Sequence, residues 1–201
     1  MPRFRRIRRS VDLALGSDRA LNQQVVIVRH TEVARAWHGR CYGSSDIPLS
    51  RSGRTAMTAL AARLAAERPT WVVHSGLVRT CHLAERIVML AGCTLHEDED
   101  WRERDFGTWE GQNWKAIYRA TGNAMDRMLT SPDEFRPGGG ETTMELAARV
   151  NGAFGRLPRN FGFVITHGGP IAALIGTHRA VPVTSWATLI PRQGETIRWT
   201  R

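Results

Sequence analysis

Two histidines that lie far apart in the sequence each end an apolar run. His30 follows Val25–Arg29, and His167 follows Phe163–Thr166 and precedes Gly168, which allows a ligand to approach the backbone closely. An imidazole can act as a nucleophile, transfer a proton or bind an anion. Open α/β sheets place such residues at the carboxyl ends of their strands, and adjacent strands can come from distant segments. We therefore expect both imidazoles in one site.

Two arginines add positive charge to this expected site. Arg29 precedes His30, so one strand end offers a cation to hold an anion and an imidazole to attack it. Arg79 falls in the first turn of a predicted helix, where free N–H groups and the helix dipole favour an anion and disfavour a cation. An anion bound by Arg79 would offset that local cost. The alternative is an exposed Arg79 paired with Glu85 or Asp46.

An acidic and aromatic loop, Trp101–Gly111, follows a predicted short strand and contains Glu103. A loop in this place can hold a carboxylate over the end of the sheet. A carboxylic acid beside a bound phosphate has its pKa raised by the like charge, which suits a general acid. The alternative is that the acids of this loop form surface salt bridges with Arg102 and Arg104.

Alternating predicted strands and helices position these residues. Strands are expected at 24–29, 71–74, 94–96 and 161–166, with a final strand pair at about 184–200. Helices are expected at about 53–67, after a cap at Ser75, irregularly over 113–130, after a capping box formed by Thr142 and Glu145, and around Pro170. This alternation predicts a three-layer α/β/α sandwich with a mostly parallel central sheet.

Composition and charge narrow the class of protein. The chain has 201 residues, 42% of them hydrophobic, and no apolar run approaches the length of a membrane span. Arginines 3, 5, 6, 8 and 9 supply five of the positive charges, so without them the net charge falls from +9 to +4. The remainder suits an enzyme with anionic substrates and does not demand nucleic acid. We predict a basic, disordered N-terminal extension at 1–22 and one domain at 23–201.

The cysteines indicate a reducing compartment. Cys41, Cys81 and Cys93 are odd in number and lack C-x-x-C spacing, which is typical of neither a disulfide framework nor a zinc site. Reduced thiols in a cytoplasmic protein are the simplest interpretation.

Six motifs in order resemble those of the histidine phosphatase superfamily, also called phosphoglycerate mutase-like, over residues 25 to about 176. They are Arg29-His30, the turn Asp46–Arg54, Ser75–Thr80 with its arginine, the acid loop Glu103–Gly111, Pro137–Thr142 and Thr166–Gly169. The resemblance implies a phosphoglycerate mutase-like fold and a phosphoric monoester hydrolase that needs no metal or other cofactor.

The resemblance also implies a role for each matched residue. His30 would attack phosphorus and become a phosphohistidine, while Arg29, Arg79 and His167 would bind the equatorial oxygens. Glu103 would protonate the leaving oxygen and then activate water. The residues expected to contact phosphate or substrate are Arg29, Thr31, Tyr42, Gly43, Arg79, His167 and Gly168.

Three residues depart from the family pattern. Tyr42 stands where many members have a small residue such as serine, and the other two support alternatives. Thr31 replaces the usual glycine after the nucleophile, and Ala36 stands where many members have a phosphate-contacting asparagine. These residues favour a catalytically weak, phospho-ligand-binding or regulatory member as one alternative. A phosphoglycerate mutase is another, although the segment 111–137 is shorter than the insertion typical of cofactor-dependent mutases.

The segment Cys41–Leu49 is similar to that of a bacterial subgroup, the α-ribazole phosphatases of cobalamin assembly. Four aromatic residues are candidates to line the mouth of the site and stack on a nucleoside-like or benzimidazole-like group, or else to pack in the core: Trp37, Tyr42, Trp109 and Trp114. The expected partner is a small-molecule phosphate ester, with no nucleic acid and no membrane. A strand near 196–200 would leave a sheet edge open to a homodimer.

Overall fold

The computed structural model of the protein describes residues 24–200, and the predicted N-terminal extension lies outside them. The strands are β1 (Gln24–Arg29), β2 (Trp71–His74), β3 (Thr94–Glu97), β4 (Gly162–Thr166) and β5 (Thr196–Thr200). The α-helices are α1 (Arg51–Ala65), α2 (Val78–Ala91), α3 (Trp114–Thr121), α4 (Arg127–Thr130), α5 (Thr143–Arg156) and α6 (Gly168–His178). Short 3₁₀ turns occur at Arg35–Trp37, Glu99–Trp101, Gly107–Trp109, Gly122–Asp126, Pro137–Gly139 and Val183–Leu189.

The five strands form one sheet in the order β3-β2-β4-β1-β5. All neighbouring pairs are parallel except β1 with β5. β1 and β4 lie side by side with Arg29 opposite Thr166. The residue that follows each strand is a histidine, and both histidines lie at the carboxyl ends of the strands. The main-chain N–H of His30 donates to the carbonyl oxygen of Thr166 over 3.0 Å. The prediction that distant segments bring the two imidazoles together is confirmed.

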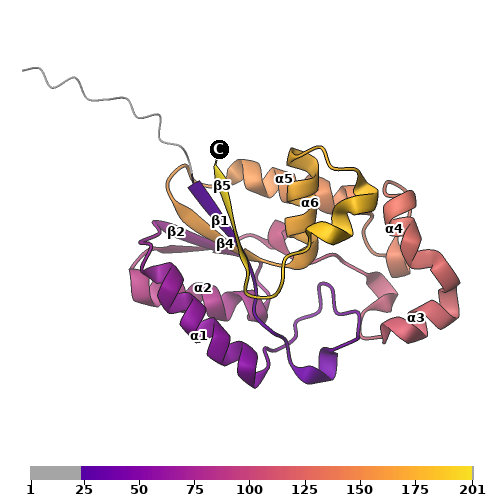
Figure 1. Ribbon diagram of the computed structural model, residues 1–201, viewed down its shortest axis with the longest axis horizontal. Coiled ribbons are helices and arrows are strands. Elements are labelled where there is room, and N and C mark those ends of the chain that lie inside the picture. Colours follow the sequence, from indigo (N-terminus) through magenta and orange to yellow (C-terminus); the bar gives the residue numbers. More distant parts are fainter. Residues whose placement is uncertain (1–23, 201) are drawn as a thin grey trace, which may run out of the picture.

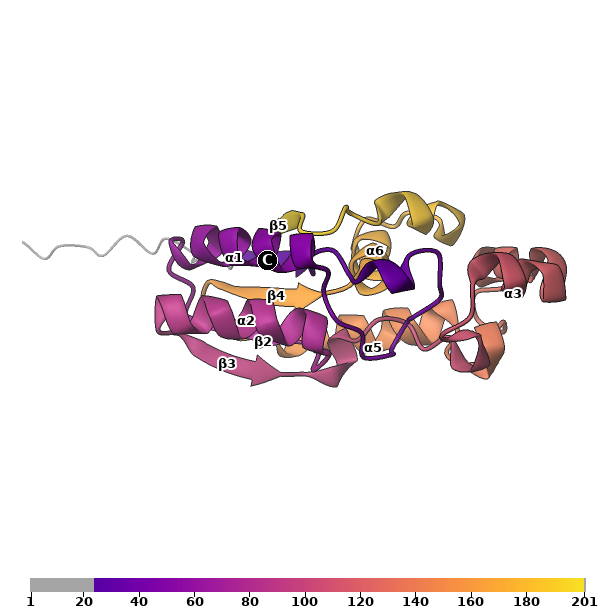
Figure 2. The ribbon, with the colours of Figure 1, turned by 90° about the horizontal axis from the view of Figure 1, so that it is seen from below.

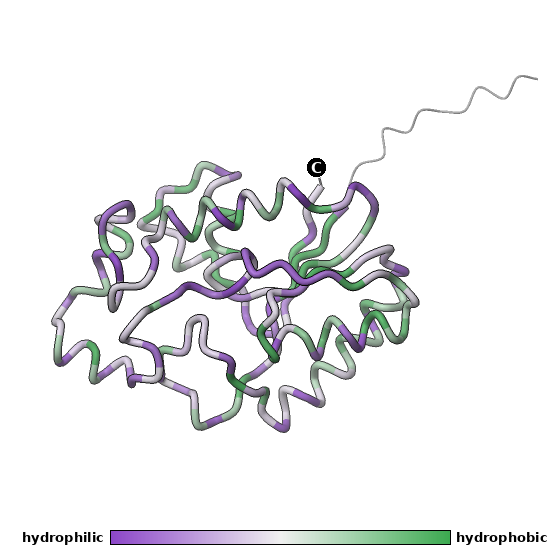
Figure 3. Tube along the Cα trace, turned by 180° about the vertical axis from the view of Figure 1, so that it is seen from behind, coloured by the Kyte–Doolittle hydropathy of each residue, from purple (hydrophilic) through white to green (hydrophobic). Residues whose placement is uncertain are grey.

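Alternation along the strands builds three layers. Val25 and Ile27 pack in a core cluster with residues of α5 and α6, whereas Val26 and Val28 pack with residues of α1 and α2. Figures 1 and 2 show the helices on the two faces of the sheet, and Figure 3 shows hydrophobic colouring concentrated along the central strands. The predicted three-layer α/β/α sandwich with a mostly parallel sheet is confirmed.

Two predicted helix starts can be compared with the structure. The Thr142 hydroxyl accepts from the N–H of Glu145 over 3.1 Å, and the Glu145 carboxylate accepts from the N–H of Thr142 over 3.0 Å. The predicted capping box therefore begins α5. The predicted cap at Ser75 is wrong, because α2 begins at Val78 with Leu77 as its N-cap. The Ser75 hydroxyl instead bonds to side chains of the site.

The predicted final strand pair at 184–200 is also wrong. Residues Val183–Leu189 form 3₁₀ turns, and β5 is the one strand of this segment. The turns bury the indole of Trp186 against Gly176 of α6, and its Nε1 donates to the carbonyl of Val181 over 2.9 Å. Burial of a large indole outweighs strand pairing here. β5 does lie at a sheet edge, as predicted.

A lobe beyond the sheet carries α3 and α4 (Figure 1). Its small core contains Cys41, Trp109 and Ile117, with Trp114 and Phe135 packed against them. This lobe forms one wall of the cavity described below. No helix within residues 24–200 is long and apolar enough to cross a membrane.

Candidate active site

The orientation of the His30 imidazole is fixed by its own chain. Its Nδ1 lies 2.7 Å from the carbonyl oxygen of Thr31. A carbonyl can only accept, so Nδ1 carries the proton and Nε2 keeps its lone pair. Burial, together with the nearby positive charge of Arg79, lowers the pKa of His30 to about 3. The imidazole is therefore neutral near pH 7, with the nitrogen that a nucleophile requires unprotonated.

The His167 ring lies beside that of His30, with the ring centroids 5.2 Å apart. Arg79 Nε donates to His167 Nδ1 over 3.2 Å, which places the His167 proton on Nε2. Nε2 then donates to the Ser75 hydroxyl over 2.8 Å, which donates to Thr80 over 2.9 Å. The Thr80 hydroxyl ends the chain at the carbonyl of Leu77 over 2.7 Å. Burial, followed by the charge of Arg79, holds the pKa of His167 well below its usual value.

Arg79 is fully buried, which contradicts the alternative of an exposed arginine paired with Glu85 or Asp46. Besides its bond to His167, its guanidinium donates to the carbonyl oxygens of Ser45 and Gly43, each over 2.7 Å. These three bonds point the guanidinium in one direction, so Arg79 is a rigid cation beside the two histidines.

Arg29 is the last residue of β1 and precedes His30. Its Nη1 donates to the carbonyl of Pro191 over 2.6 Å, while its buried Nε has no hydrogen-bond partner among residues 24–200. Neither arginine forms an ion pair within this part of the chain. Two guanidiniums without carboxylate partners make a cluster with net positive charge, which suits a phosphate dianion.

Glu103 is held at the start of α6. Its carboxylate oxygens accept from the main-chain N–H of Gly169 over 3.1 and 3.2 Å, and Oε1 accepts from the N–H of Arg104 over 3.0 Å. A Cβ on residue 169 would collide with Oε1, so only glycine permits this approach. Gly168 packs tightly as well, because a Cβ there would lie 3.2 Å from Arg29 Cζ.

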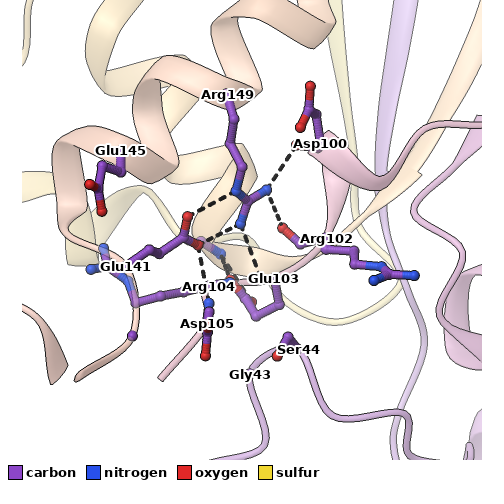
Figure 4. A network of polar contacts seen from close by, with 12 residues as sticks. Gly43, Ser44, Asp100, Arg102, Glu103, Arg104, Asp105, Glu141, Glu145 and Arg149 are labelled. Atoms are coloured by element: carbon purple, nitrogen blue, oxygen red, sulfur yellow. Dashed lines mark hydrogen bonds and ion pairs between the residues drawn. The ribbon is translucent and has the colours of Figure 1, made fainter. Parts of the chain in front are cut away.

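Arg149 of α5 binds the loop that carries Glu103 and holds it in place (Figure 4). Its guanidinium donates to the main-chain carbonyls of Asp100 and Arg102 over 2.8 Å and of Glu103 over 3.1 Å. It also pairs with the Glu141 carboxylate over 2.6 Å. The same carboxylate accepts from the N–H of Asp105 over 3.1 Å. The alternative of surface salt bridges is wrong for Arg104, which forms none within 24–200, while Arg102 pairs with Glu99.

Glu110 fixes the turn that carries Gly43. Its carboxylate accepts from the N–H groups of Ser44 and Ser45 over 2.8 and 2.7 Å, and from both of their hydroxyls. Burial acts to raise the pKa of Glu110, but these hydrogen bonds outweigh it and hold the pKa below its usual value. The carbonyls of Gly43 and Ser45, which bind Arg79, are thereby held in place.

A cavity of about 410 Å³ borders this cluster. The residues that line its end nearest the histidines and arginines are Tyr42, Gly43, Glu103 and Gly169. Tyr42 lies under Arg79, whose Cζ is 5.5 Å from the ring centroid. Of the predicted aromatic residues, Tyr42 and Trp114 line the cavity, whereas Trp109 packs in the core of the lobe and Trp37 does not contribute to the wall.

Thr31 and Ala36, which depart from the family pattern, leave the nucleophile undisturbed. The Thr31 hydroxyl donates to the carbonyl of Gly53 at the start of α1 over 2.9 Å, so in this structure it supports a helix end. Ala36 is exposed within the 3₁₀ turn Arg35–Trp37. Neither residue disturbs the bond between His30 and the Thr31 carbonyl.

Sequence motifs missed several contacts that shape the site. Ser75 and Thr80 belong to a predicted motif, but the bond from His167 to Ser75 and the bond from Ser75 to Thr80 were not predicted. Arg149 had no distinguishing signal, because it is one of many arginines on helices. Glu141 follows the glycine run 138–140 in the sequence. Its contacts with Asp105 and Arg149 depend on tertiary structure and could not be predicted.

The sequence pattern of the histidine phosphatase superfamily (branch 1) matches residues 25–198, and the chain belongs to this superfamily. The probable phosphoglycerate mutase GpmB of Salmonella paratyphi C is 29% identical over 168 residues, which span 82% of this chain and 77% of that protein. GpmB of Escherichia coli O1:K1 is 30% identical over the same shares.

Solved structures agree on the fold. Mycobacterial glucosyl-3-phosphoglycerate phosphatase has a TM-score of 0.78 and 26% identity, covering 88% of this chain and 89% of that one. The α-ribazole phosphatase from Shigella flexneri has a TM-score of 0.76 and 21% identity over 87% and 89%, which is a likeness of fold alone. The predicted family, the phosphoglycerate mutase-like fold and the class of phosphoric monoester hydrolase are confirmed.

Proposed function

We propose that this protein is a metal-independent phosphomonoesterase that acts on a small-molecule phosphate through a phosphohistidine on His30. The observation that carries the proposal is the fixed tautomer of His30, which leaves Nε2 unprotonated beside two guanidiniums that form no ion pair with a carboxylate among residues 24–200. A neutral nucleophile and unpaired cations are what attack on a phosphate dianion requires.

The remaining residues take roles that fit their contacts. Arg29 and Arg79 bind the phosphoryl oxygens, and Glu103 protonates the leaving oxygen from the cavity side and then activates water. His167 holds Arg79 through Nδ1 and gains an oxygen ligand by exchanging its bond to Ser75. Oxygens on phosphorus become more negative in the transition state, so these cations stabilise it more than the ground state.

The leaving group lies in the cavity beside Glu103. The cavity volume of about 410 Å³ and its aromatic residues Tyr42 and Trp114 suit a ring-sized group. α-Ribazole 5′-phosphate, whose leaving group carries a benzimidazole, is one substrate of this kind. The likeness to GpmB raises the mutase alternative, which would transfer the phosphoryl group between positions of phosphoglycerate and would release no phosphate.

Hydrolysis of para-nitrophenyl phosphate in excess EDTA tests the proposal. We expect steady release of phosphate and an acid-labile ³²P adduct on the protein during turnover with a labelled substrate. Phosphate release that stops on chelation would contradict the metal-independent mechanism. Interconversion of phosphoglycerates without phosphate release would favour the mutase. Tight phosphate binding with neither reaction would favour the binding or regulatory alternative.

We expect Arg149→Lys to act through Glu103. A lysine cannot bridge three carbonyls and a carboxylate at once, so the loop loses its clamp. Since the pair is largely buried, we expect a loss of about 1–3 kcal/mol in unfolding free energy and about a tenfold lower kcat on alkyl phosphates. Urea unfolding and steady-state kinetics measure these effects.

Arg156→Lys is the matched control for Arg149→Lys. Arg156 lies on the same helix and pairs with Asp98 and Asp100, but it is exposed. We expect it to cost less than about 1 kcal/mol and to leave kcat unchanged. Equal effects of the two variants on kcat would show that Arg149 does not position the acid.

A further inference from the structure

Arg104 lies in the wall of the cavity, one residue beyond the proposed acid. Its side chain is only 9% exposed. Nη2 donates to the hydroxyl of Thr143 over 3.0 Å, whereas the buried Nη1 has no hydrogen-bond partner among residues 24–200. The guanidinium also lies against the Phe106 ring, with Cζ 5.8 Å from its centroid. Arg104 therefore has unused hydrogen-bonding capacity in an enclosed place.

Burial lowers the pKa of Arg104, and the nearby carboxylates of Glu103 and Glu141 offset only part of that effect. No carboxylate in the described part of the chain forms an ion pair with it. Glu103 faces Gly169, and Glu141 is taken by Arg149. A guanidinium stays protonated when it is buried. Burying such a charge without a direct ion pair is unfavourable, and proteins retain unfavourable features of this kind mostly where function uses them.

The rest of the cavity wall is mostly apolar. Its apolar residues include Trp114, Met125, Leu129, Ala172, Trp186 and Ile190. Aromatic and methionine side chains present adaptable surfaces for a flat, apolar group. The wall also contains Arg40, but this arginine is exposed and its guanidinium donates to the carbonyls of Ala36 and Gly111. Arg104 is thus the buried cation of the wall, and its Nη1 has no hydrogen-bond partner among residues 24–200.

We propose that Arg104 is a specificity-determining residue that binds a second anionic group, such as a carboxylate, on a ring-containing leaving group of the substrate. The ring would fill the apolar cavity between Arg104 and Glu103, with the phosphoryl group at His30. This inference rests on the proposed phosphatase function and narrows its substrate class. α-Ribazole 5′-phosphate has the ring but no second anion, so it meets one of these two requirements.

A panel of aryl phosphates tests the proposal. The probes are phenyl phosphate, 4-carboxyphenyl phosphate and 4-carbamoylphenyl phosphate, the last being a neutral match in shape and electron withdrawal. We expect the wild-type protein to show a kcat/KM about tenfold or more higher for the carboxylate than for the amide. A ratio near one would overturn the proposal, and this comparison needs no variant.

Two variants locate the effect. In Arg104→Met, which keeps length and removes charge, we expect the ratio to fall to within about twofold of one, with phenyl phosphate still hydrolysed. In the matched control Arg40→Met we expect the wild-type ratio. Thermal unfolding checks the fold, and removal of an unpaired buried charge should not lower Tm. A wild-type ratio retained in Arg104→Met would overturn the assignment to this residue.

The outcomes for the wild-type protein separate the two proposals. If none of the three aryl phosphates is hydrolysed, the proposed phosphatase function fails. If the neutral esters are hydrolysed as well as the carboxylate, the phosphatase function stands and only the role of Arg104 fails.

Discussion

His30→Asn is expected to lower kcat for para-nitrophenyl phosphate by about 10⁴-fold or more, because the attacking nitrogen is lost while the neighbouring cations remain. Asparagine fits the volume of a buried site and its amide can still donate to the Thr31 carbonyl. We therefore expect phosphate to bind with little change in Kd, measured by calorimetry. The labelled phosphohistidine should be absent from this variant.

His74→Asn is the matched control for the nucleophile. His74 is also buried and also ends a parallel strand, but its Nδ1 accepts from the N–H of Gly76, a bond that an asparagine oxygen can replace. We expect kcat within about tenfold of wild type. Residual phosphohistidine in His30→Asn, or an equal loss in both variants, would show that His30 is not the nucleophile.

Glu103→Gln is expected to separate two classes of substrate. A glutamine keeps the contacts with Gly169 but cannot give a proton to the leaving oxygen. For an alkyl phosphate, whose leaving oxygen needs that proton, we expect the first chemical step to slow by about 10²–10⁴-fold. Nitrophenolate leaves without a proton, so its release should be far less affected.

Rapid-mixing kinetics measure this difference. With para-nitrophenyl phosphate, Glu103→Gln should release one equivalent of nitrophenolate in a burst and then stall, because the base that activates water is also lost. Asp105→Asn is the matched control, since Asp105 is exposed in the same loop and its carboxylate accepts from the N–H of Gly107. Equal slowing of the first step for alkyl and aryl esters would rule out Glu103 as the acid.

Glu103, the proposed acid, and Arg104, the proposed anion-binding residue, are adjacent along the chain but differ in their surroundings. Glu103 binds main-chain N–H groups at the beginning of α6, whereas Arg104 is enclosed by Phe106 and Thr143. The leaving-group dependence of Glu103→Gln and the carboxylate preference lost in Arg104→Met therefore report separate steps. A single general loss of activity in both variants would indicate damage to the loop.

The sequence by itself determined the first four strands, the two strand-end histidines and the capping box of α5. Continuous apolar runs and a reciprocal pair such as Thr142 and Glu145 depend on neighbours along the chain, so local physics is sufficient to predict them. The family motifs likewise identified Arg29, His30, Arg79, Glu103 and His167 as candidate site residues. Their roles remain predictions.

Only the tertiary structure decided how these residues are held. Arg149 looks like an ordinary surface charge in the sequence, and the motifs that contain Glu141 and Arg104 do not show what these two residues bind. Their contacts form between helices and loops that are distant along the chain. The same reason explains the errors at Ser75 and at residues 184–189. Ser75 turns away from the helix end to bond to His167, and Trp186 is buried against α6. In each case a long-range contact outweighs a local preference.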